Sequence, residues 1–166
     1  MHEPIWLSVA RAFVGVLELP GPGSNPLILR WATEIGAPAW YDSDAKAWCA
    51  VFLNRILLAV QQPMAGTGYA LLRAGTFETY GVPLTTATLG AILVFDRPEG
   101  HHVGFYLGER DDAYLVLAGN QANAVSVRWI LKSRLTAMRW PADVAVSETG
   151  PILITARDGG PSEDEA

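Results

Sequence analysis

Apolar residues recur at helical spacing near the start of the chain. Residues 4–17 repeat them every three or four positions, which predicts a helix with a proline in its first turn. The repeated positions are Ile5, Val9, Ala12, Phe13 and Val16. The following segment, ELPGPGSNP (residues 18–26), contains three prolines and two glycines and ends this helix.

Two further helices are predicted before residue 61. Ser24 or Asn25 can cap a helix that has Pro26 at its first position and ends at Gly36. Residues 47–60 form the third predicted helix. This segment is apolar on nearly all sides, which is typical of a helix buried in the centre of a domain.

From about residue 90 the pattern changes to short runs with strand character, separated by turn residues. The connecting segments carry the Gly, Pro, Asn and Asp that tight turns require. We predict consecutive antiparallel strands at residues 91–95, 102–108, 113–118, 124–130 and 137–140. The pattern of residues 75–84 predicts no particular element.

Helices followed by strands indicate an α+β fold, with the helices packed on an antiparallel sheet meander. The length of 166 residues fits one domain, which we assign to residues 1–141. Residues 142–166 lose the periodicity and end in an acidic, Gly/Pro-containing sequence. We expect this segment to be a flexible tail.

Composition narrows the possible functions. The formal net charge is −5, and the sequence contains no run of Lys or Arg, so nucleic acid is not an expected partner. No segment approaches 18 consecutive apolar residues, and the first residues lack the pattern of a signal peptide, so we expect a protein made in the cytoplasm without a membrane span. With one cysteine and three histidines, the chain has few residues that could bind a metal, so we expect no metal or other cofactor.

The single cysteine, Cys49, lies at the start of the third predicted helix. A free cysteine is often a small buried apolar residue. It becomes a nucleophile only as a thiolate, which the positive end of a helix and a nearby base both favour. The position alone leaves both interpretations open.

A histidine and an asparagine are predicted to converge at one end of the sheet. His102 begins a strand, and a turn near Arg110 would pair it close to Ala118, two positions before Asn120. A Cys/His/Asn set provides a nucleophile, a base and a residue that orients the base. Gln121 is the less favoured orienting residue. Alternatively, His102 caps a turn and Asn120 only serves the turn GNQAN.

Four segments carry a resemblance to a known family. WCAVFLNRILL, GAILVFDRPEGHHVGFYLGE, YLVLAGNQANAVSV and MRWP resemble, in this order and spacing, the CHAP branch of the NlpC/P60-like papain-fold cysteine peptidases. The similarity runs from about residue 5 to 141 and is greatest to a small group found in prophages and phage-like particles. The resemblance implies a papain-like α+β fold and cleavage of amide bonds in bacterial peptidoglycan.

The resemblance also implies roles for individual residues. Cys49 matches the nucleophile, His102 the base, and Asn120 the third polar residue, whereas His101 has no match. Some relatives carry Glu where this chain has Ala118. The oxyanion is expected at the Cys49 backbone N–H and a side chain of the preceding loop, with Tyr41 or Trp48 near it. Gln121 is a further candidate for this surface.

We therefore expect a peptidoglycan hydrolase, either a stem-peptide endopeptidase or an N-acetylmuramoyl-L-alanine amidase, acting through a thioester without a metal. Aromatic residues of the loop around Trp40 and of residues 66–77 are expected to line the substrate groove. Without a signal peptide, the enzyme would reach the cell wall by phage-type lysis, in a phage-like particle, or through a secretion system. The alternatives are a non-catalytic structural or wall-binding component of such a particle, or a papain-fold amidase toxin.

Overall fold

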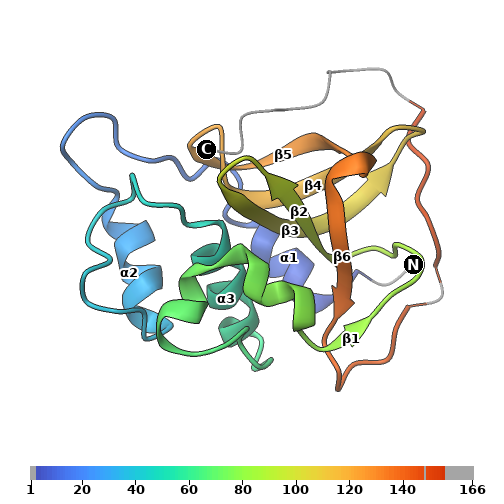
Figure 1. Cartoon of the computed structure of the whole chain (residues 1–166), viewed down its shortest axis with the longest axis horizontal. Helices are drawn as coiled ribbons and strands as arrows, with labels where there is room; N and C mark the ends of the chain where they lie inside the picture. Colours follow the sequence, from blue (N-terminus) through green and yellow to red (C-terminus); the bar gives the residue numbers. More distant parts are fainter. Residues whose placement is uncertain (1–2, 148, 156–166) are drawn as a thin grey trace.

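The computed structural model describes residues 3–147 and 149–155. Over these residues the chain has an α+β architecture, with three α-helices, three short 3-10 helices and one six-stranded antiparallel sheet. Figure 1 shows the helices gathered below the curved sheet. No helix in the described part is both long enough and apolar enough to span a membrane.

The three predicted α-helices are present, with shorter bounds. Helix α1 covers Ile5–Arg11, α2 covers Pro26–Glu34 and α3 covers Cys49–Ala59. The side chain of Asn25 caps α2 by accepting a hydrogen bond of 2.9 Å from the backbone N–H of Leu27. Thus Asn25, and not Ser24, is the cap.

Helix α1 ends six residues before the predicted end at residue 17. Gly15 has a φ of 98°, which a right-handed helix excludes. The backbone of residues 15–18 then pairs with residues 123–125 instead of continuing the helix: Gly15 N–H donates to the Val125 carbonyl at 2.9 Å, and Val125 N–H donates to the Val16 carbonyl at 2.8 Å. Pairing with a distant strand therefore outweighs the local helical periodicity.

The predicted strands are present, and one more is added. Their bounds are β1 Val82–Pro83, β2 Ile92–Arg97, β3 Gly100–Glu109, β4 Ala113–Gln121, β5 Ala124–Leu131 and β6 Leu135–Trp140. Short 3-10 helices cover Gly68–Leu72 (η1), Ala74–Thr79 (η2) and Lys132–Arg134 (η3). Residues 75–84, which predicted no element, thus contribute to η2 and β1.

The sheet is not the simple meander that the sequence predicts. Its strand order is β1-β6-β2-β3-β4-β5, so β6 returns to the opposite side and pairs with β2. Only β2 to β5 follow one another as neighbours. The return places β6 between β1 and β2, where Trp140 pairs with Val82.

The register of β3 and β4 also differs from the prediction. Phe105 pairs with Leu117, and the ladder shifts by one residue between Tyr106 and Gly108. A turn centred near Arg110 without this irregularity would have placed Phe105 opposite Leu115. The β3–β4 pairing runs from Phe105 to Glu109, and His102, which was predicted to pair close to Ala118, lies before it and pairs with Phe95 of β2.

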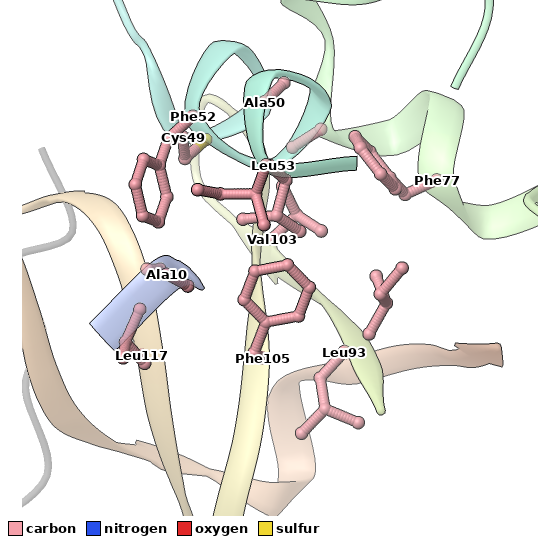
Figure 2. Packing of buried hydrophobic residues seen from close by; sticks show 14 of the residues in the cluster. Ala10, Cys49, Ala50, Phe52, Leu53, Phe77, Leu93, Val103, Phe105 and Leu117 are labelled. Carbon is pink, nitrogen blue, oxygen red and sulfur yellow. The ribbon is translucent and has the colours of Figure 1, made fainter. Parts of the chain in front are cut away.

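Helix α3 packs against β3 and β4 in the centre of the molecule. Figure 2 shows Phe52 and Leu53 of this helix directed towards Val103, Phe105 and the neighbouring strand. All of these side chains are buried. Because an apolar helix and an apolar sheet face exclude water together, the position of the first turn of α3 relative to β3 is strongly fixed.

Part of the predicted tail is attached to the sheet. Glu109 N–H donates to the Ile152 carbonyl, and Ile154 N–H donates to the Glu109 carbonyl, both at 2.8 Å. The backbone N–H of Ile152 also donates to the Tyr106 hydroxyl at 3.0 Å. These contacts hold residues 152–154 beside β3; residues 156–166 lie outside the described residues.

Candidate active site

Cys49 is the first residue of α3, as the sequence predicts, and its side chain is only 2 % exposed. Burial raises the pKa of its thiol. The positive charge of Arg97 and the backbone N–H groups of Val103, Ala50 and Cys49 itself act in the opposite direction. The contribution of Val103 places the sulfur beside the strand residue that directly follows His102.

His102 lies on β3 and is fully buried. Its Nε2 atom is 3.3 Å from Oε1 of Gln121, and its Nδ1 atom has no hydrogen-bond partner among the described residues. Burial, followed by the positive charges of Arg97 and Arg134, lowers the pKa of the imidazole to about 3, although the bond to Gln121 acts in the opposite direction. The ring is therefore neutral near pH 7.

The hydrogen bond of the imidazole joins it to Gln121, the residue that the sequence favours less as its orienting partner. Asn120 precedes it with a φ of 58°, within an irregularity of the β4–β5 pairing between Ala118 and Gln121. This left-handed conformation is one that asparagine tolerates better than most residues. The alternative reading of Asn120 as a turn residue therefore agrees with its backbone.

The adjacent histidine has a different environment. His101 Nε2 lies 3.4 Å from a carboxylate oxygen of Glu78, and its ring is next to Gly75 of η2. Neighbouring residues of a strand point to opposite faces. The two histidines are thus separated by strand geometry, and only His102 is bonded to Gln121.

Tyr41 and Trp48, the two predicted oxyanion candidates, are buried beside α3. The Tyr41 hydroxyl donates to the Lys46 carbonyl at 3.0 Å. Burial raises the pKa of Tyr41, and the negative charge of a Cys49 thiolate would raise it further, so this ring lies near the sulfur. The Trp48 indole N–H donates to Glu18 at 2.6 Å, so this donor is already engaged.

The predicted aromatic groove residues divide into buried and exposed groups. Tyr41 and Phe77 belong to the core. In contrast, Trp40 and Tyr69 are 52 % and 57 % exposed, and their ring centroids are 5.8 Å apart. Lys46 and Arg73 lie over the rings of Trp40 and Tyr69, respectively. We refer to Trp40 and Tyr69 together as the aromatic pair.

Sequence reasoning missed the two arginines whose charges act on the site. Arg97 is the last residue of β2 and pairs with Gly100, so it shares a strand face with Phe95 and His102. Arg134 lies in η3 and donates from Nε to the Asp96 carbonyl at 2.9 Å. Only four residues separate Arg97 from His102 in the sequence, and this short connection could have indicated that Arg97 lies near the imidazole.

The structure brings the His102 imidazole and the Gln121 amide together, and it places the Cys49 sulfur beside the backbone of Val103. Nδ1 of His102 has no hydrogen-bond partner among the described residues, so the thiol is not bonded to it in this structure. A thiol, an imidazole and an amide are the groups that nucleophilic acyl transfer requires. Within residues 3–147 and 149–155, no three His, Cys, Asp or Glu side chains gather as a metal site would require. Comparison of the chain with models of known protein families and with curated proteins found no match.

Proposed function

We propose that the protein is a papain-like cysteine peptidase or amidase that hydrolyses an amide bond of bacterial peptidoglycan. The observation that carries the proposal is the position of Cys49 at the start of α3, beside the residue that follows His102, whose ring is bonded to Gln121. A nucleophile, a base and an amide on the base are the components of this chemistry.

In the proposed reaction the Cys49 thiol gives its proton to Nδ1 of His102, and the sulfur attacks the amide carbon. The C–N bond then breaks, the leaving amine takes the proton from the imidazolium, and a thioester remains on Cys49. Water gives a proton to the imidazole as it attacks this thioester. The acid product leaves as the proton returns to the sulfur.

Two features of the structure favour a neutral thiol and a neutral imidazole before substrate binds. Burial raises the pKa of Cys49 and lowers the pKa of His102. The helix terminus, the Val103 N–H and the charge of Arg97 favour the thiolate once the proton leaves. Because Cys49 is 2 % exposed, catalysis also requires the surrounding chain to open.

Peptidoglycan is proposed as the substrate because of the sequence resemblance and the exposed aromatic pair. An aromatic face carries partial negative charge and attracts the positively polarised C–H groups of a sugar ring. Exposed aromatic side chains from two separate segments are suited to such contacts. The resemblance to the prophage group supports delivery to the wall by a phage-like particle.

The proposal is tested by clearing of a peptidoglycan suspension with the wild-type protein and with Cys49→Ala. We expect clearing by the wild type and none by Cys49→Ala, while His101→Ala, which changes the neighbouring imidazole, remains active. Equal clearing by the wild type and Cys49→Ala, or none by either, contradicts the proposal. Mass spectrometry of the released fragments then distinguishes a stem-peptide endopeptidase from an amidase.

The burial of both Cys49 and His102 favours a second candidate, a non-catalytic component of a phage-like particle that binds the wall. This candidate predicts sedimentation of the protein with peptidoglycan and no clearing at any pH. An amidase toxin acting on another acyl compound predicts neither sedimentation nor clearing, but a thioester on Cys49 with its own substrate.

A further inference from the structure

We propose that Gln121, rather than Asn120, is the residue that positions His102, and that it does so by fixing the tautomer of the ring. This inference rests on the proposed function, because it assigns a role in the same reaction. It starts from the hydrogen bonds of one buried amide and requires no contact with substrate.

The Gln121 side chain is fully buried, and the groups around it determine which way its amide points. Its nitrogen donates to the Ser126 carbonyl at 2.7 Å and to the Val116 carbonyl at 3.3 Å. Both amide hydrogens are therefore used on backbone acceptors. The reverse orientation would place the amide oxygen against two carbonyl oxygens and leave buried acceptors unpaired.

The fixed amide oxygen decides the protonation of the imidazole. Oε1 of Gln121 lies 3.3 Å from Nε2 of His102, and an oxygen can only accept at this contact. A neutral ring must therefore carry its hydrogen on Nε2. Nδ1 is then left with a lone pair, and it has no hydrogen-bond partner among the described residues. It is therefore the ring nitrogen that can accept a proton.

The end of β4 explains why the neighbouring asparagine does not take this role. The β4–β5 pairing is regular up to Ala118 and resumes at Gln121, which pairs with Ala124. Asn120 lies within this irregularity in a left-handed conformation. Its backbone therefore makes the bend that brings Gln121 to the level of His102, and Ser126 fastens the bend by donating from Oγ to the Gln121 carbonyl at 3.0 Å.

Nitrogen NMR of the histidine rings tests this inference without substrate. The chain has three histidines, so His101→Gln and loss of the signal in His102→Gln identify the ring of interest. At pH 7 we expect His102 with hydrogen on Nε2 and a bare Nδ1. A wild-type ring with hydrogen on Nδ1 overturns the proposal, whatever the behaviour of any variant.

Two variants separate the neighbours. Gln121→Met keeps the approximate size of the side chain and removes the amide, whereas Asn120→Gly removes an amide and keeps the left-handed backbone accessible. We expect Gln121→Met to mix the two tautomers and Asn120→Gly to retain the wild-type ring. The opposite result assigns the role to Asn120 and refutes the proposal.

Activity provides a second readout. Gln121→Met should lower kcat for peptidoglycan on the order of 10²–10⁴-fold, the usual contribution of a positioned proton-transfer group, with a much smaller change in KM. The pH profile should also move, because the positive charges of Arg97 and Arg134 act on the ring of His102. Because the tautomer is measured without substrate, a wild-type protein that cleaves no peptidoglycan refutes the proposed function and still decides the role of Gln121.

Discussion

Gly119 lies on β4 where this strand passes the first turn of α3, and its replacement by alanine tests how closely the two elements must approach. A Cβ at this position would lie 2.7 Å from Cβ of Phe52 and 2.7 Å from Cζ3 of Trp48. Carbon atoms in contact are normally about 3.5–4.0 Å apart. The strand and the helix would therefore have to separate by about 1 Å.

We expect two measurable consequences of Gly119→Ala. Overpacking of a close-packed core costs about 1–3 kcal/mol, and each kcal/mol lowers Tm by roughly 2–4 °C in a chain of this size. The first turn of α3 carries Cys49, and a shift of about 1 Å can reduce the rate by about 100-fold. Thermal melting followed by circular dichroism and the peptidoglycan-clearing assay measure the two effects.

Gly23→Ala is the matched control. The nearest atom to its added Cβ is Cδ1 of Leu19 at 3.7 Å, an ordinary contact distance. We expect a change of stability within about 0.5 kcal/mol for this variant. If Gly119→Ala melts at the wild-type temperature, the close approach of β4 and α3 does not limit the fold, and the argument is refuted.

Three further predictions concern pH, binding and a buried carboxylate. The pKa of His102 is lowered to about 3 in the folded protein, so the unfolded chain binds the proton first as pH falls. The free energy of unfolding should therefore decrease from about pH 6.5 towards pH 3. This decrease should be smaller in His102→Gln. Replacing Trp40 and Tyr69 together by alanine should reduce cosedimentation with peptidoglycan at least tenfold without lowering Tm, because both rings are exposed. Asp44→Ala should destabilise by about 1–3 kcal/mol, since its buried carboxylate accepts from two backbone N–H groups, whereas the exposed Asp42→Ala should change stability little.

Each of these predictions has a result that contradicts it. Equal losses of Tm at low pH in the wild type and His102→Gln would show that the buried imidazole does not contribute to acid sensitivity. Cosedimentation that falls equally in Ile5→Ala, another exposed apolar residue, would show that the aromatic pair has no special role. A Tm for Asp44→Ala equal to that of Asp42→Ala would show that the two N–H groups find other acceptors.

The sequence predicted most local elements because their signals are local. The buried helix around Cys49 and the cap at Asn25 follow from apolar periodicity and from the residue types at the helix starts. The position of β6 could not be predicted, because it depends on pairing with β2 over more than 30 intervening residues. The predicted end of α1 was wrong because it also depends on a distant pairing, that of residues 15–18 with residues 123–125.

At the candidate site, the sequence identified the residue types and missed part of their arrangement. Cys49 follows from the start of a helix, whereas His102, which was predicted to begin a strand, is the third residue of β3, which begins at Gly100. The partner of the imidazole depends on two irregularities of β4, one beside Tyr106 and one after Ala118. A shift of one residue exchanges which side chain faces a given neighbour, and nothing in the residue types fixes such a shift.

The pairing of residues 15–18 with β5 also bears on how the protein behaves at high concentration. A strand at the margin of a sheet presents unpaired N–H and C=O groups that can join a strand of another molecule. Here the backbone of Gly15, Val16 and Glu18 occupies positions along Asn123 and Val125 of β5 or the turn before it. The segment thus occupies this part of the margin, so the N–H and C=O groups that it pairs are not available to a strand of another molecule.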